Sequence, residues 1–106
     1  MELFENKIQL NILYDMYGEL LTDSQREIFE SYYGDDLSLQ EIADNRGISR
    51  NAVHDSLKKT ISHLELLEST LHGVEKAQKR EELYKKLENN PANKDIVDAL
   101  RAIEEE

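Results

Sequence analysis

The sequence predicts an all-α protein organised around a helix-turn-helix motif. Apolar residues recur at spacings of three and four along most of its 106 residues, which is the period of an α-helix. One proline and four glycines leave few points at which helices must end. Residues 38–57 carry the capping and turn residues of two short helices joined by a sharp bend. This stretch is the most specific of the three signals, because nearly every position in it has a physical role.

A first helix is predicted from about residue 2 to residue 21. Its apolar stripe consists of Leu3, Phe4, Ile8, Ile12, Leu13, Met16, Tyr17, Leu20 and Leu21. Gly18 weakens the last turn of this helix. Tyr14 and Tyr17 could form a stacking surface for bases, but aromatic residues on an apolar helical stripe are typical of a core. We therefore interpret both tyrosines as core residues.

A second helix is predicted to begin after Thr22, because Thr22 and Gln25 have the spacing of a capping box. A polar turn at residues 34–36 ends it. Arg26 is either a phosphate contact beside the motif or half of a surface ion pair, and the ion pair is the favoured interpretation. The pattern predicts three buried residues, Ile28, Phe29 and Tyr32.

The first helix of the motif is predicted to begin at about Leu39. Ser38 and Glu41 form a second capping box, in which the hydroxyl and the carboxylate each satisfy an amide at the helix start. Leu39, Ile42 and Ala43 share one helical face. We expect Ala43 to be small because the second helix of the motif crosses there.

The turn of the motif is predicted at Gly47, where glycine tolerates a left-handed backbone conformation. Ile48 is expected to fill the turn, and Ser49 to cap the second helix. Arg46 stands where such motifs usually carry an apolar residue, so its stem is expected to lie along the helix pair with the charge outside. The second helix directs Val53 and Leu57 inward and places Arg50, Asn51, His54 and Lys58 on its outer side.

The second motif helix is predicted to be unusually long, because its apolar spacing continues without a break. Two series of positions seven residues apart extend through it: Val53, Thr60, Leu67 and Val74, and Leu57, Leu64 and Leu71. They form either a short heptad seam for another helix or a surface that packs against the N-terminal helix. Gly73 predicts a kink or an end nearby.

The remainder of the chain is predicted to be a helical C-terminal extension. Residues 75–89 are strongly charged and have a narrow apolar stripe that requires a partner surface. Asn90 as a cap and Pro91 at the first position begin a last helix. We thus divide the chain into a helix-turn-helix domain, residues 1–74, and an extension, residues 75–106. The last helix has an apolar face formed by Ile96, Val97, Leu100 and Ile103.

Composition limits the classes of function. The chain has no cysteine and three dispersed histidines, so neither a disulfide nor a metal site is predicted, and no cofactor is implied. No apolar run is long enough to cross a membrane and no leader is recognisable, which predicts a soluble cytoplasmic protein. No pair of nucleophile and base stands out, so catalysis is not expected.

The charge is acidic overall, but its distribution favours one basic region. The net charge is −10. Residues 1–38 carry nine acids against two bases, whereas residues 39–80 carry six acids against seven bases. Between residues 46 and 59 the only acid, Asp55, is opposed by the bases Arg46, Arg50, Lys58 and Lys59. Contact with DNA should therefore be modest and strongly dependent on salt.

Part of the sequence resembles the fourth conserved region of bacterial sigma factors, which reads the upstream promoter element. The resemblance covers about residues 20–60 and rests on the runs LTDSQREIF at 21–29, YGDDLSLQEIA at 33–43 and GISRNAV at 47–53. In that family the recognition helix usually continues with basic residues. Here His54, Asp55 and Ser56 follow instead, so the resemblance does not imply tight promoter reading.

Over its whole length the sequence resembles the YlxM family of small bacterial proteins. The resemblance rests on Leu13-Tyr14-Asp15 and on the runs YGELLT at 17–22 and SRNAVHD at 49–55. It implies a DNA-binding or regulatory protein that is linked to the signal recognition particle pathway, because genes of this family neighbour those for the protein components of the particle.

Two functions from different classes are consistent with these observations. The favoured one is a DNA-binding regulator that places the helix after Ser49 in a major groove. The alternative is an interaction module that docks on the signal recognition particle or its GTPase without reading DNA. We also expect a homodimer held by the C-terminal half, because one copy cannot easily cover its own apolar stripes. The alternative is a monomer whose last two helices fold back on the long one. The predicted nucleic-acid-binding residues are Arg46, Ser49, Arg50, Asn51, His54, Lys58 and Lys59.

Overall fold

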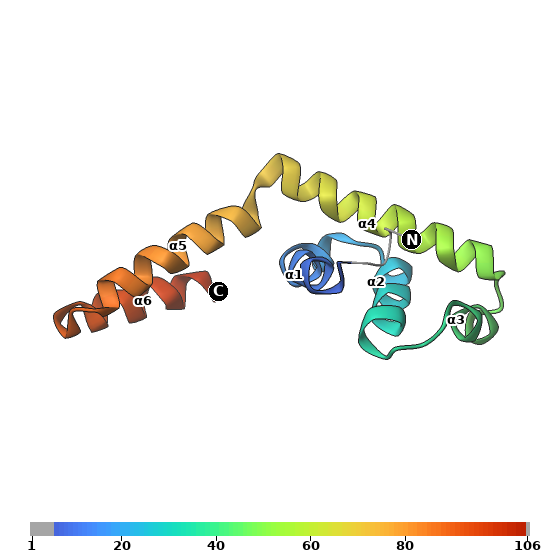
Figure 1. Cartoon of the computed structure of the whole chain (residues 1–106), viewed down its shortest axis with the longest axis horizontal. Coiled ribbons are helices and arrows are strands. Elements are labelled where there is room, and N and C mark those ends of the chain that lie inside the picture. The colour runs from blue at the N-terminus through green and yellow to red at the C-terminus, as the bar shows by residue number, and fades with distance from the viewer. Residues whose placement is uncertain (1–5, 106) are drawn as a thin grey trace. The chain divides into compact units, whose positions relative to one another are not determined.

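The computed structural model describes residues 6–105 and confirms the all-α prediction (Figure 1). Within that range it contains six α-helices, joined by short 3₁₀ and π segments, and no strand. The chain forms two compact units, Met1–His72 and Gly73–Glu106. The helices are α1 (Lys7–Tyr17), α2 (Asp23–Phe29), α3 (Leu39–Arg46), α4 (Arg50–Leu71), α5 (Gly73–Glu88) and α6 (Lys94–Glu104).

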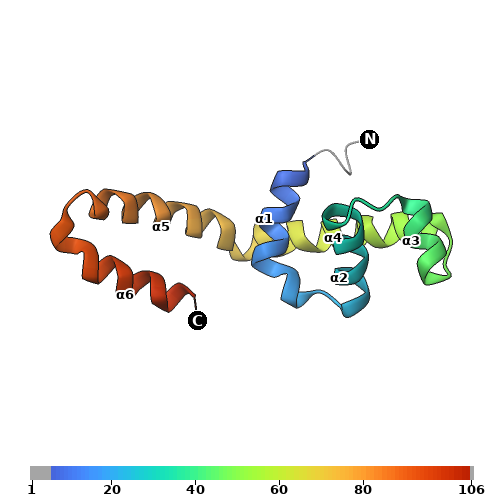
Figure 2. The same cartoon turned by 90° about the horizontal axis from the view of Figure 1, so that it is seen from below.

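Helix α4 is the central element of the first unit. Helices α1, α2 and α3 all contact it and lie on one side of it (Figures 1 and 2). Val53, Leu57 and Leu64 on its inward face have no exposed surface. Thr60 is also buried, and its hydroxyl donates a 2.8 Å hydrogen bond to the Ser56 carbonyl, so this polar group is satisfied. This inward face is the core of the unit.

Of the two tyrosines of α1, Tyr17 is a core residue, as predicted, whereas Tyr14 is half-buried. Tyr17 is buried and donates a 2.6 Å hydrogen bond to Glu68 near the end of α4. The Tyr14 ring stacks on Phe29 with centroids 4.4 Å apart, and its hydroxyl donates to Glu30 at 2.6 Å. Burial, with the added effect of the Glu30 carboxylate, raises the pKa of Tyr14 to about 12. The part of the predicted first helix before residue 6 lies outside the described residues.

The end of the second helix differs from the prediction. The capping box is confirmed, because the Gln25 amide donates to the Thr22 hydroxyl and the Thr22 amide to the Gln25 side chain, both at 3.1 Å. However, α2 continues into a π segment, Glu30–Gly34. Because a π turn is wider than an α turn, Tyr33 replaces Tyr32 on the inward side. Tyr33 is buried, with its ring centroid 4.6 Å from that of Phe29, whereas Tyr32 is half-buried.

The motif has the local geometry that the sequence predicts. The Ser38 hydroxyl accepts a hydrogen bond from the Glu41 amide, and the Glu41 carboxylate accepts one from the Ser38 amide, both at 3.0 Å. Gly47 has a φ of 67°, in the left-handed region. The Ile48 amide then donates to the Ala43 carbonyl at 3.1 Å, which closes the end of α3. Ile48 does not fill the turn completely, because 40% of its surface is exposed.

Helix α4 is long, as predicted, but it ends before Val74. His72 caps it in a left-handed conformation, with a φ of 54°, and donates its amide to the Glu68 carbonyl at 2.8 Å. Leu71 is consequently exposed, and Val74 belongs to α5. The heptad positions that are buried in the first unit lie against α1, α2 and α3, so packing within one copy is the better interpretation of the seam there.

The second unit is an antiparallel hairpin of α5 and α6 (Figure 2). The predicted start of its second arm is confirmed: the Asn90 side chain accepts a 3.1 Å hydrogen bond from the Ala92 amide, and Pro91 occupies the first position of a 3₁₀ turn that leads into α6. Only three apolar side chains of the described part of this unit are buried, Val74, Tyr84 and Val97.

Residues 6–105 contain neither a membrane-spanning helix nor a cluster of metal ligands. None of the helices there is both long and apolar enough to cross a lipid bilayer. Nor do three or more His, Cys, Asp or Glu side chains come together there as ligands for a metal ion.

We predict that Gly47→Ala lowers the free energy of unfolding by about 1 kcal/mol, because an L side chain is strained in the left-handed region. The added methyl group would meet no atom within 4 Å, so a clash makes no contribution. Gly34→Ala is the matched control, since its methyl group also has open space and its backbone is not left-handed. Thermal unfolding followed by circular dichroism measures both variants. Equal melting temperatures would show that the left-handed turn is not a source of strain.

Candidate nucleic-acid interface

The candidate interface is the N-terminal half of α4, which follows the turn of the motif. The Ser49 hydroxyl accepts a 3.0 Å hydrogen bond from the Ala52 amide, which confirms Ser49 as the cap. Because this bond orients the hydroxyl toward the helix, Ser49 stabilises the start of α4 at Arg50. Inward packing of Val53 and Leu57 then determines which side of the helix faces solvent.

The predicted contact residues of α4 are arranged on its accessible side. Arg50, Asn51, Lys58 and Lys59 are exposed, and His54 is half-buried. Arg50, His54 and Lys58 are four residues apart and form one edge of that side, whereas Lys59 lies on the opposite edge. Among residues 6–105, neither Arg50 nor the two lysines form an ion pair with a carboxylate. Their charges are therefore available to an anionic ligand.

Asp55 lies between the two edges and reduces the positive charge of the surface. Its carboxylate is exposed and 3.9 Å from Nδ1 of His54. A carboxylate at this position would face DNA phosphates if the whole side of the helix were inserted deeply. The arrangement thus favours contacts by the N-terminal end and the two edges of α4 over close contact along its whole length.

The N-terminus of α4 differs from those of the two preceding helices. Asp23 lies in the first turn of α2 and Glu41 in that of α3, whereas the first turn of α4 contains no acidic residue. The partial positive charge of a helix N-terminus is therefore not offset by a carboxylate in α4, and Arg50 adds a full charge beside it. These features suit a phosphate group of a nucleic acid.

Arg46 has a structural role that the sequence did not reveal. Its guanidinium donates to the Glu27 carboxylate at 2.8 Å and to the Ser24 hydroxyl at 3.2 Å, so it connects the end of α3 to α2. About a third of its side chain is exposed, at 31%. Glu27 and Ser24 are 19 and 22 residues away in sequence, and no local pattern identifies them as partners. Arg46 thus links the end of α3 to α2.

Arg26 forms the ion pair that the sequence favoured. Its guanidinium contacts the Asp23 carboxylate one turn earlier in α2. This pair is exposed, and such pairs contribute little to stability.

Comparison with known proteins gives one consistent result. A sequence model of the family described as "Putative helix-turn-helix protein, YlxM / p13 like" matches residues 4–103. A UPF0122 protein of Malacoplasma penetrans is 45% identical over 82 residues, which are 77% of this chain and 77% of that protein. A UPF0122 protein of Listeria welshimeri is 41% identical over 96 residues, covering 91% of this chain and 87% of that protein. One from Mycoplasma capricolum is 41% identical over 102 residues, covering 95% and 90%.

We predict that Arg46 and Glu27 are energetically coupled in the free protein. A double-mutant cycle with Arg46→Ala and Glu27→Ala should give a coupling energy of about 0.5 kcal/mol, typical of a largely exposed pair. Urea unfolding of the four proteins measures it. The coupling should weaken in high salt, because the pair is accessible to ions. A coupling of zero at low salt would show that Arg46 does not connect the two helices.

Proposed function

The chain belongs to the YlxM / p13-like helix-turn-helix family, and on this premise we propose that it is a DNA-binding regulatory protein of the bacterial cytoplasm. In this proposal the N-terminal half of α4 enters a major groove. Arg50 and Asn51 approach base edges, and Lys58 and Lys59 contact phosphates. Ser49 and Arg46 position the helix, and His54 lies at the edge of the contact.

The observation that carries the proposal is the set of unpaired bases on the accessible side of α4. All four other arginines, Arg26, Arg46, Arg80 and Arg101, are paired with a carboxylate. Arg50, by contrast, is exposed at the beginning of a capped helix whose first turn lacks an acid. A cation can bind phosphate most readily when it has no carboxylate partner within the protein.

The same charges limit the affinity. Each copy offers few phosphate contacts, and the net charge of −10 opposes approach to DNA. Binding should therefore be observed at low salt and weaken steeply as salt is added. A homodimer is part of the proposal, because paired recognition helices can read half-sites about one DNA turn apart and so double the number of contacts.

The test is the double variant Arg50→Ala, Lys58→Ala in a mobility-shift assay at low salt. We expect at least a tenfold loss of affinity for duplex DNA with unchanged helicity, because both side chains are exposed and pack against nothing in the core. Lys85→Ala, Lys94→Ala is the matched control, since it removes the same charge from α5 and α6. Equal affinities of the two double variants would eliminate α4 as the DNA-reading helix.

Docking on the signal recognition particle or its GTPase is the second candidate function. The acidic excess favours it, since residues 1–38 carry nine acids against two bases and would suit a basic protein partner. The link to this pathway comes from the family resemblance.

A pull-down of the tagged protein from a bacterial lysate, with and without nuclease, separates the two functions. DNA fragments that are retained only without nuclease are expected from the proposed function. Protein components of the particle that persist after nuclease treatment would instead support the second candidate.

A further inference from the structure

The α5–α6 hairpin has an apolar face that its own unit does not cover. We call it the hairpin face, and it consists of Leu83, Leu87, Ile96, Leu100 and Ile103, which are 58%, 38%, 63%, 37% and 65% exposed. Two packed helices with so few buried side chains cannot supply the core that an independent unit of this size needs. An apolar surface of this kind marks an interaction site.

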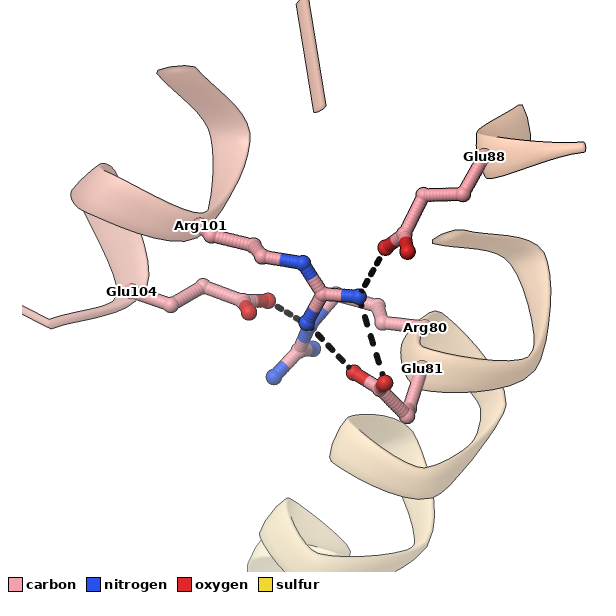
Figure 3. Close-up of polar contacts among 5 residues, drawn as sticks. All are labelled: Arg80, Glu81, Glu88, Arg101 and Glu104. Carbon is pink, nitrogen blue, oxygen red and sulfur yellow. Dashed lines mark hydrogen bonds and ion pairs between the residues drawn. The ribbon is translucent and has the colours of Figure 1, made fainter. Parts of the chain in front are cut away.

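The five residues share one face, as the contact between Arg80 and Glu104 shows (Figure 3). Arg80 precedes Leu83 and Leu87 by three and seven residues, which places all three on one stripe of α5. Glu104 follows Ile96 and Leu100 by eight and four residues, which places these on one stripe of α6. Since the ion pair joins the two stripes, both face the same way.

A second group of contacts holds the two helices together on the other side. Arg101 donates to Glu81 at 2.7 Å and also binds Glu88, which is seven residues further along α5 (Figure 3). Its guanidinium lies over the Tyr84 ring, 4.8 Å from the centroid. The hydrogen bond from Arg101 lowers the pKa of the Glu81 carboxyl, so the group stays ionised. The hairpin face is therefore preorganised.

We propose that the hairpin face binds the same face of a second copy, so that α5 of each copy lies against α6 of its partner in an antiparallel four-helix bundle. The proposal names the interface of the homodimer included in the proposed function, and it does not depend on DNA binding. An isologous contact suits this surface, because both partners then offer the same aliphatic side chains.

Two charges beside the hairpin face support a second copy as the occupant and favour one symmetry. On the outer edge of α5, Lys79 is ion-paired with Glu75 at 3.1 Å, whereas Lys86 lies three residues after Leu83, near the turn of the hairpin. The outer edge of α6 carries Asp95, Ala99 and Ile103, which are spaced four residues apart. Near the turn of the hairpin, α5 thus presents a lysine and α6 an aspartate, followed by a small residue that permits close approach.

A two-fold axis parallel to the helices would bring these unlike charges together. Lys86 and Asp95 both lie near the turn of the hairpin, so Lys86 of one copy would lie beside Asp95 of its partner. Within residues 6–105 of one copy, neither side chain forms an ion pair. An axis perpendicular to the helices would instead pair α5 with α5 of the partner and leave Lys86 and the partner's Asp95 at opposite ends of the bundle.

Sedimentation equilibrium of the full chain tests the interface. The wild-type protein should be a dimer at micromolar concentration, and Ile96→Asp should be a monomer, because it places a charge in the centre of the bundle. Ile8→Asp is the matched control, since Ile8 is 80% exposed on α1 and the change is chemically identical. A monomeric wild type, or a dimer that Ile96→Asp leaves intact, would overturn the proposal.

A charge exchange tests the symmetry without disturbing the apolar residues. Lys86→Glu and Asp95→Lys should each weaken the dimer about fivefold, since each change affects two pairs per dimer, and the combined variant should recover wild-type affinity. Additive weakening in the combined variant would exclude the pairing of α5 with α6 of the partner. The Arg50→Ala, Lys58→Ala protein should still dimerise, so failure of DNA binding and failure of this interface give different results.

Discussion

Burial of the inward face of α4 is the constraint on which the rest of the first unit depends. Val53, Leu57 and Leu64 are completely enclosed, and α1, α2 and α3 all contact this helix. Full burial of each such side chain is worth about 1.5–3 kcal/mol, which makes the face a large share of the stability of so small a unit. Because the inward residues cannot rotate outward, the accessible side of α4 is determined by the same packing.

Because packing of the core also fixes the accessible side of α4, few further contacts are needed to position the motif. The Ser49 hydroxyl and the left-handed Gly47 determine where α4 begins, and the bond from Arg46 to Glu27 ties the turn to α2. Arg50 is consequently presented at a defined position relative to a rigid scaffold. Since an acidic molecule gains little from general attraction to phosphates, the proposed DNA binding would depend on the placement of a few side chains.

The two units differ in how much of their apolar surface they bury. The first has a closed core, whereas the second has two helices, a preorganised apolar face and only three buried apolar side chains among its described residues. In the proposed dimer, a thin hairpin of this kind would gain stability from association, and assembly and folding of the second unit would be linked. The boundary between the two units lies at His72, because its left-handed backbone ends α4 before α5 begins.

The sequence by itself determined the helices, both capping boxes, the turn at Gly47 and the start at Asn90 and Pro91, because each of these depends on residues within about four positions of one another. The structure alone decided that Tyr33 replaces Tyr32 in the core, since a wider π turn changes the helical phase.

It also decided that Arg46, predicted to contact DNA, binds Glu27, and that two stripes on separate helices form the hairpin face. Both depend on residues far apart in the chain, whose proximity is set by packing and leaves no local pattern. The bases of α4 could be predicted only in part. Periodicity shows which side of the helix they occupy, but whether each one is paired depends on which carboxylates the fold brings near.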